Sequence, residues 1–236
     1  MKFEYKSIMK TNLTVKIDGI NWERHLIKTH FITVDDNLEK IVEKYVLPLA
    51  KENDIVVLCQ KIVSIIQKRI VYKKNIKVGF WATILSKFVK KTPYGFSVGN
   101  PLKMQVAINI AGLPRVLIAS FLGFTTKLLG ITGIFYRVVG NQVSEIDGFY
   151  GEAFPQYSDM GILGPKNCNS LCDNLKNKFN LSFAVADVND LGGNILGINQ
   201  DIKGKEKLLS QILKDNPAGQ SNEQTPIIIV RIENAN

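Results

Sequence analysis

A short apolar run in the last quarter of the chain is followed at once by acidic and amide side chains. The run Phe183–Ala186 predicts a buried strand, and Asp187, Asn189 and Asp190 come directly after it. Carboxylate and carbonyl oxygens are the ligands that hard divalent cations prefer, so this junction is a candidate metal site. The pair Gly192–Gly193 would let the backbone turn and approach a ligand closely. A polar strand-to-loop junction built from turn-forming Asn and Asp is the competing interpretation.

Two further polar stretches lie next to apolar runs that resemble strands. Asp147 follows Glu145 and Ile146, and the stretch GQSNEQT at 219–225 precedes PIIIVRI. Ligands of α/β proteins bind where strand ends meet loops. If the three ends share one edge, Asp147, Asp187 and a side chain such as Gln220 or Glu223 would surround one or two ions of Mg²⁺ or Mn²⁺. Neither GxxxxGK[ST] nor GxGxxG occurs, so both standard phosphate loops are excluded.

The elements that must position these residues alternate irregularly along the chain, which predicts a mixed α/β fold. Strands are predicted at 13–17, 54–60, 183–186 and 227–232. Helices are predicted after the capping pair Asp35–Asp36, at 80–89, from Pro101, through Leu171, Leu175 and Phe179, and at 205–213. The aromatic and methionine side chains of the second and third of these helices are interpreted as core. Without an obvious linker, 1–236 is either one domain or two interlocked lobes.

The connections between these elements give weaker patterns. KIVSIIQKRIV at 61–71 fits helix and strand equally, and 68–77 is expected to be a basic, solvent-facing connection. The apolar stretch 113–136 is expected to form a strand and then a buried hairpin or short helix, because its uncharged run Val116–Thr126 is shorter than the roughly 20 residues of a membrane span. Peripheral contact with a membrane is the alternative for this stretch. A hairpin of 134–139 and 142–146 is expected to follow through Gly140–Asn141.

Charge is distributed unevenly. Up to Lys103 the chain holds 19 Lys and Arg against 9 Asp and Glu, and the remainder holds 11 against 12. A basic first half favours an anionic ligand such as a nucleotide, a phosphorylated substrate or RNA, whereas a solvated basic surface needs no ligand. Three cysteines make no even disulfide framework, and the charged N-terminus does not resemble a signal peptide, so a cytoplasmic location is expected.

Several blocks of sequence together resemble the gamma-glutamyl ligases of the deazaflavin coenzyme F-420, and especially their uncharacterised bacterial relatives. The resemblance runs from about Thr29 to Arg231. The blocks that carry it are THFITVDDNL at 29–38, DIVVLCQKIVS at 54–64, KTPYG at 91–95, GLPR at 112–115, EIDG at 145–148, LGPKN at 163–167, DVNDLGGNILG at 187–197 and DNPAGQSNEQTP at 215–226.

This resemblance implies a mixed α/β fold of two intertwined lobes within one gamma-glutamyl-ligase-like domain, and a homodimer. No membrane span and no nucleic-acid partner are expected. It implies an enzyme that binds GTP or ATP and a divalent metal and adds glutamate to the lactyl side chain of the coenzyme. The implied metal residues are Asp147, Asp187 and Gln220. The implied nucleotide residues are Thr29, His30, Phe31, Ile32, Gln60, Lys61 and Asn189.

Two departures from the characterised ligases leave the activity open. These ligases commonly carry VSKAEGR where this chain reads VSIIQKR, so Ile65 stands where a phosphate-binding lysine is expected. Lys61 and Lys68 are the candidates to replace that lysine, and the apolar insertion at 113–136 is the second departure. A non-catalytic nucleotide- or metabolite-binding protein of the same fold is therefore the alternative. An RNA-binding protein is a third class, which no interleaving of aromatic and basic residues supports.

Overall fold

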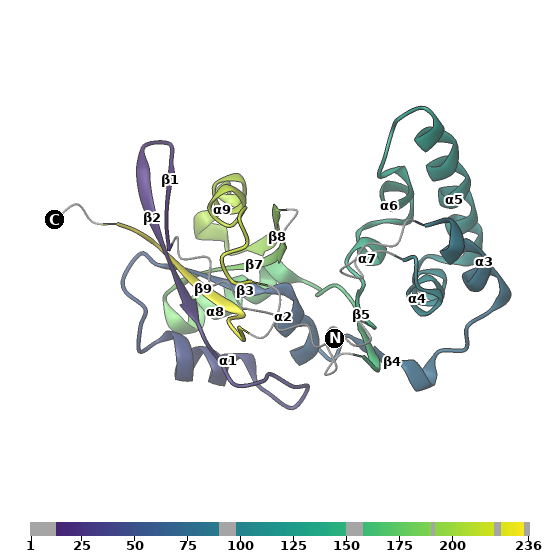
Figure 1. The fold of residues 1–236 in the computed structure, drawn as a ribbon. Helices are drawn as coiled ribbons and strands as arrows, with labels where there is room; N and C mark the ends of the chain where they lie inside the picture. The colour runs from purple at the N-terminus through teal and green to yellow at the C-terminus, as the bar shows by residue number, and fades with distance from the viewer. Residues whose placement is uncertain (1–12, 90–97, 150–157, 190–191, 220–222, 234–236) are drawn as a thin grey trace, which may run out of the picture. The chain divides into compact units, whose positions relative to one another are not determined.

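The chain of this computed structural model divides into two units (Figure 1). The structure describes residues 13–89, 98–149, 158–189, 192–219 and 223–233. Unit 1 is assembled from Met1–Lys68 and Pro165–Asn236, and unit 2 is the continuous segment Arg69–Gly164 between them. The fold is mixed α/β, as the sequence predicts, with a six-stranded sheet in unit 1 and a three-stranded sheet in unit 2.

The sheet of unit 1 has the strand order β1-β2-β9-β3-β7-β8. Its strands are β1 (Thr14–Ile17), β2 (Ile20–Ile27), β3 (Ile55–Cys59), β7 (Ser182–Asn189), β8 (Gly192–Ile198) and β9 (Ile227–Ile232). Strands β3 and β7 are parallel, and all other neighbours are antiparallel. The ends of β2, β3 and β7 therefore lie at the same edge of the sheet as the start of β9.

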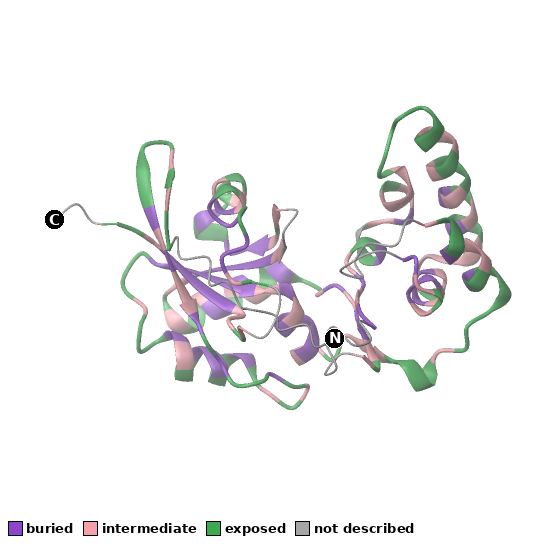
Figure 2. Ribbon diagram, viewed as in Figure 1, coloured by how far each residue is buried: buried purple, intermediate pink, exposed green. Residues whose placement is uncertain are grey.

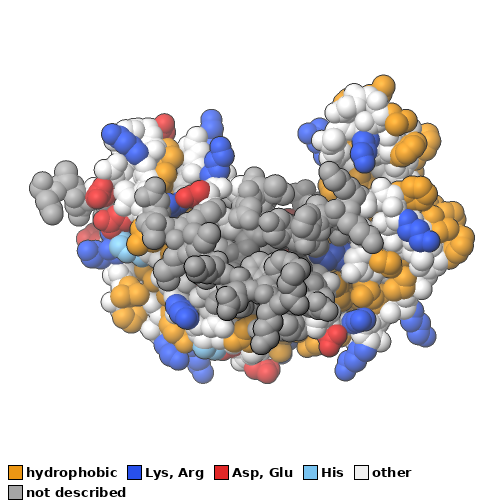
Figure 3. Space-filling model, in the orientation of Figure 1, with side chains coloured by type: hydrophobic (Ala, Val, Ile, Leu, Met, Phe, Trp, Pro, Cys, Tyr) orange, Lys and Arg blue, Asp and Glu red, His pale blue; other side chains and the backbone are white. Residues whose placement is uncertain are grey.

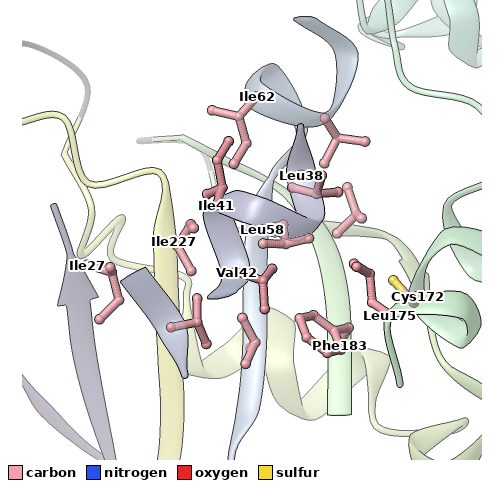
Figure 4. Close-up of a cluster of buried hydrophobic side chains, with 14 of the residues drawn as sticks. Ile27, Leu38, Ile41, Val42, Leu58, Ile62, Cys172, Leu175, Phe183 and Ile227 are labelled. Atoms are coloured by element: carbon pink, nitrogen blue, oxygen red, sulfur yellow. The ribbon is translucent and has the colours of Figure 1, made fainter. Parts of the chain in front are cut away.

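The central strands are apolar throughout because both faces of the sheet are covered. Successive side chains of β3 point to opposite faces, so Val56 and Leu58 pack in one buried cluster and Ile55 and Val57 pack in the other. Figure 2 shows these strands as the most buried part of unit 1. In the first cluster, shown in Figure 4, Leu58 and Phe183 of the sheet point toward side chains of α1, α2 and α8.

Helices of unit 1 cover these two faces. The first face carries α1 (Leu38–Ile41), the π-helix η1 (Val42–Val46), α2 (Gln60–Ile66) and α8 (Cys168–Phe179). The second face carries η5 (Gln200–Ile202) and α9 (Glu206–Ile212). The predicted cap of the first helix was wrong by one residue: Asn37 accepts the backbone N–H of Lys40 at 3.1 Å. Cys168 and Cys172 are buried and face the core, as their spacing predicts.

Unit 2 combines a small sheet with a helical cluster. Its elements are β4 (Ile70–Tyr72), η2 (Lys73–Asn75), α3 (Phe80–Phe88), α4 (Pro101–Ala111), α5 (Leu113–Leu128), α6 (Ile134–Val139), α7 (Asn141–Ser144), β5 (Asp147–Gly148) and β6 (Met160–Ile162). Strand β6 lies between β4 and β5 and is antiparallel to both. The predicted basic, solvent-facing connection over 68–77 has its lysines exposed, but it also contains a strand, because Ile70–Tyr72 pairs with Met160–Ile162.

The prediction for residues 113–146 was wrong. Residues 113–128 form helix α5, and α6 and α7 replace the expected hairpin. Inside α5, Val116 and Ala119 are buried three residues apart on one face, a period that the uninterrupted apolar sequence hides. Gly123 is accommodated in the helix because its Cα faces α6 closely: an added Cβ would lie 3.1 Å from Cβ of Phe135.

The helix at 80–89 and the helix from Pro101 are confirmed as α3 and α4, but the aromatic side chains of α3 are not core. Phe80, Trp81 and Phe88 are exposed, whereas Met104 and Ala107 of α4 are buried as predicted. No single described helix has the length and hydropathy of a membrane span, although α4 and α5 pass that test jointly across a bend of 117°.

Candidate functional site

Four chain segments meet at one edge of the unit 1 sheet. Ile227 is paired with both Ile27 and Leu58, so the chain leaves β2 and β3 next to the point where it enters β9. The N–H of Thr29 donates to the carbonyl oxygen of Gln224 at 3.0 Å, and the N–H of Cys59 donates to that of Pro226 at 2.9 Å. We call this part of unit 1 the C-terminal edge; it consists of residues 28–32, 59–61, 187–189 and 223–226.

The first of these segments holds the predicted nucleotide residues Thr29 to Ile32. Thr29 is buried and its hydroxyl donates to the carbonyl oxygen of His30 at 2.9 Å. His30 and Phe31 are exposed, whereas the side chain of Ile32 packs in the first core cluster. The segment therefore offers a ligand the His30 and Phe31 side chains, while any contact by Ile32 would come from its backbone.

Gln60 and Asp187 each directly follow a residue of one paired position in the sheet. Their preceding residues, Cys59 and Ala186, are paired in the parallel register of β3 and β7. Side chains alternate along β7, so Asp187 lies on the face opposite to that of Val188, which packs against the second core cluster. Gln60 is buried, and its Oε1 atom has no hydrogen-bond partner within the described part of the chain. A buried carbonyl oxygen of this kind is stabilised by a bound donor or cation.

The donor set at this edge fits a hard divalent cation. Magnesium is commonly held by one or two protein oxygens together with nucleotide phosphates and water. Asp187 supplies a carboxylate and Gln60 supplies a carbonyl oxygen, while Gln220 lies outside the described residues. Within the described ranges, no group of three or more His, Cys, Asp and Glu side chains is arranged to hold a metal ion. The protein oxygens described here would therefore share the ion with a phosphate-bearing ligand.

The segment around Asp187 differs from the predicted loop. Strand β7 continues to Asn189, and Asp187 is paired with Asn194 of β8 instead of following the strand. Gly192 and Gly193 also belong to β8, where the carbonyl oxygen of Gly193 accepts the Ser210 hydroxyl of α9. Gly193 therefore serves packing between β8 and α9, where an added Cβ would lie 3.3 Å from Cβ of Leu213, whereas Gly192 has a φ of +139° and no atom within 4 Å of an added Cβ. Asn189 pairs with Gly192, but its side chain lies outside the described residues.

Asp147 belongs to unit 2, whereas Asp187 belongs to unit 1. It is the first residue of β5 and is paired with Ile162. The chain before it is the short helix α7 and not the predicted strand. Gly148 follows with φ of +87°, and a Cβ there would collide with the carbonyl oxygen of Met160, so the EIDG block requires its glycine for strand pairing.

A hydrogen-bonded chain of three ionisable side chains, which the sequence did not reveal, borders the C-terminal edge. His30 lies between Asp36 and Tyr45: its Nε2 is 2.8 Å from Oδ1 of Asp36, and its Nδ1 is 2.8 Å from the Tyr45 hydroxyl. Asp36 also accepts the N–H of Thr33 at 2.7 Å. Because a carboxylate only accepts, Nε2 carries a proton. Nδ1 accepts from the Tyr45 hydroxyl when the ring is neutral and donates to the Tyr45 oxygen when the ring is protonated.

This chain is expected to titrate at two pH values. The hydrogen bond to Asp36, followed by that to Tyr45, raises the pKa of His30 above 6.5. The hydrogen bonds with His30 and Lys44 lower the pKa of Tyr45 to about 8. A tyrosinate absorbance titration should therefore show one group near this value, which Tyr45→Phe removes and Tyr72→Phe retains. In NMR titration, Asp36→Asn should lower the pKa of His30.

The sign of the effect on stability differs between the two groups. The raised pKa of His30 contributes stability below 6.5 that is lost as pH rises through the folded-state pKa. The lowered pKa of Tyr45 contributes stability above 10 that is lost as pH falls through about 8. An unchanged tyrosine titration in the Tyr45→Phe variant would contradict this assignment.

Comparison with known proteins gives one family. The family model described as F420-0:Gamma-glutamyl ligase matches residues 26–187 of the 236 residues, a range that includes every predicted site residue except Asn189 and Gln220. No curated protein matches the chain. Since the model covers more than half of the sequence, the chain belongs to the F420-0:gamma-glutamyl ligase family.

Proposed function

We propose that the protein is a metal- and nucleotide-dependent carboxylate–amine ligase of the gamma-glutamyl type. Membership of the ligase family supports the reaction class. The observation that carries the proposal for a site is the convergence of Thr29, Gln60 and Asp187 at the C-terminal edge. These residues come from three blocks that are far apart in the sequence, and register pairing and two backbone hydrogen bonds bring their segments together.

The proposed reaction has two steps. The γ-phosphoryl group of the nucleotide is transferred to a carboxylate, and the amine of the second substrate then attacks the acyl phosphate and expels phosphate. A divalent ion, when bound, would neutralise charge on the phosphoryl oxygens. Asp187 is the proposed carboxylate ligand within unit 1, with Gln220 completing the set. Gln60 and the segment from Thr29 to Ile32 orient the nucleotide, with Asn189 beside it.

Lys61 is the proposed phosphate-binding cation in place of the lysine missing at position 65. Ile65 is buried, so this position offers no charge to a phosphate. Lys61 lies one helical turn earlier on α2, directly after Gln60, and residues four apart share a helix face. Lys68 is less suited because it follows the end of α2, with φ of +56°.

Nucleotide binding is expected to raise the melting temperature of the protein. At a ligand concentration of 100 times Kd, mass action adds about 2.7 kcal/mol to the free energy of unfolding. Scanning calorimetry with GTP or ATP in the presence of Mn²⁺ should show this increase, and added salt should reduce it. Lys61→Ala should reduce the increase, while the exposed Lys51→Ala, beyond the opposite end of β3, should leave it unchanged.

Turnover is tested separately with L-glutamate and the coenzyme F-420-0 as substrates. Nucleotide-dependent formation of an amide by mass spectrometry supports the ligase. A rise in melting temperature with nucleotide but without any turnover would favour the non-catalytic binding protein. The buried Ile65 is the specific observation that supports this alternative. A larger rise in melting temperature with RNA and none with nucleotide would contradict both the ligase and the non-catalytic binding protein.

A further inference from the structure

The outer face of helix α5 is apolar and exposed. This face consists of Ile118, Phe121, Leu122, Phe124, Leu128 and Leu129. Phe121, Leu128 and Leu129 retain 68%, 74% and 77% of their accessible surface. The opposite side of the same helix carries the buried Val116 and Ala119, so α5 is apolar on both sides and only one of them is covered. Such a continuous exposed apolar surface marks an interaction site.

The helical part of unit 2 is rich in positive charge. Residues 55–144 contain no Asp or Glu, and the portion from Arg69 to Ser144 contains eleven Lys and Arg. Seven of these cations are exposed in the described residues: Lys73, Lys74, Lys77, Lys87, Arg115, Lys127 and Arg137. Figure 3 shows orange side chains gathered over the outer parts of unit 2 with blue side chains between them.

The length of α5 fits a helix that lies on a membrane better than one that crosses it. Its 16 residues extend about 24 Å at 1.5 Å per residue, less than the roughly 30 Å of a bilayer core. Arg115 and Lys127 stand near its two ends. Helices of this type insert an apolar face into the headgroup and acyl boundary while their cations contact anionic lipids.

We propose that the outer face of α5 docks unit 2 onto the surface of an anionic lipid bilayer. Phe121, Phe124 and Leu128 would enter the acyl boundary, and Arg115 and Lys127, near the two ends of α5, would contact lipid phosphates. A second copy of the chain fits this face less well, because face-to-face pairing would bring two exclusively basic surfaces together. Nucleic acid would complement the charge but would leave the aliphatic side chains in water. The inference is independent of the proposed ligase activity.

Vesicle sedimentation with the full chain tests the proposal. The protein should sediment with vesicles of phosphatidylcholine and phosphatidylglycerol but remain in solution with phosphatidylcholine alone, and salt should weaken the binding. The double variant Phe121→Gln and Leu128→Gln should reduce the partition coefficient at least about a hundredfold, since burial of each of the two side chains contributes about tenfold or more. Lys127→Gln should reduce it about fivefold, as expected for roughly 1 kcal/mol per surface cation.

Two measurements keep the interpretation unambiguous. Leu49→Ser, which changes an exposed leucine of unit 1, is the matched control and should bind vesicles as the parent does. Circular dichroism should confirm that the double variant remains folded, because glutamine is a good helix former. Equal binding to both vesicle types, or binding that the double variant retains, would overturn the proposal. The proposal would also be overturned if the parent protein were a dimer that does not bind vesicles and the double variant were a monomer. That result would assign the face to self-association.

Discussion

Replacement of Arg231 by leucine is expected to lower the free energy of unfolding by about 3 to 5 kcal/mol, because it removes the cation from a buried pair. The Nε and Nη2 atoms of Arg231 donate to Oδ1 and Oδ2 of Asp54 at 2.8 and 2.7 Å. Asp54 is 1% exposed, and its carboxylate raises the pKa of Arg231. The pair joins the end of β9 to the start of β3, so the variant would leave an uncompensated charge beside the centre of the sheet.

Urea unfolding followed by tryptophan fluorescence measures this loss in unit 1. Trp22 is buried and is paired with Ile232, the residue after Arg231, and a Trp81→Phe background leaves it as the single tryptophan. The double variant Asp54→Leu and Arg231→Leu should recover much of the stability, since an apolar pair often replaces a buried ion pair without loss. Lys178→Leu, which breaks only exposed ion pairs with Glu39 and Glu43, should leave the unfolding midpoint nearly unchanged. An Arg231→Leu midpoint equal to that of Lys178→Leu would refute the prediction.

Replacement of Asp187 by asparagine is expected to lower the affinity for Mn²⁺ by about a hundredfold or more, since loss of even an outer partner of a metal ligand costs 10- to 100-fold. The variant keeps the shape of the side chain and removes one charge. Asp187 is only half-buried and lies near the end of β7, so the fold should persist. Calorimetric titration with Mn²⁺ in the presence of nucleotide measures the affinity, and the ligation assay should show that turnover is lost.

Two control variants separate a specific effect from a general loss of negative charge. Asp201→Asn changes an exposed carboxylate that pairs with Lys176, and it should bind Mn²⁺ as the parent does. Glu223→Gln, within the C-terminal edge, should have a milder effect than Asp187→Asn. If Asp187→Asn binds Mn²⁺ as tightly as the parent, the metal assignment is wrong. If it loses the metal while the parent turns over none of the acids and amines tested, the non-catalytic function is favoured.

The buried strands were predictable from sequence, whereas the helices of unit 2 were only partly so. Strands β3 and β9 are short uninterrupted apolar runs because both faces of the sheet are covered. The strand predicted for the equally apolar run in α5 was wrong, because exposed side chains such as Phe121 are as hydrophobic as buried ones such as Val116. Hydrophobic periodicity cannot separate the two sides of a helix when both are apolar.

The candidate site was predictable where it depends on strand ends and unpredictable where it depends on tertiary contacts. Polar residues near the end of β7 and before β9 indicated a shared edge, and the register of β3 with both strands brings these two ends together, whereas the third predicted end, at Asp147, belongs to unit 2. The hydrogen bonds of His30 with Asp36 and Tyr45 had no signal in the sequence. They form because the chain turns after β2 and because η1 packs its Tyr45 against the first core cluster.

The central position of β3 determines the order in which the protein can assemble during synthesis. Both neighbours of β3 in the sheet, β7 and β9, follow unit 2 in the chain. Unit 2 is contiguous and can fold as soon as it has left the ribosome, whereas β3 then still presents two unpaired apolar edges. Reciprocal hydrogen bonds between Gln67 and Lys166, both of 2.9 Å, join the chain segments that precede and follow unit 2. A ribosome that stalls within α8 therefore releases a chain whose unit 2 is complete and whose central strand lacks both neighbours.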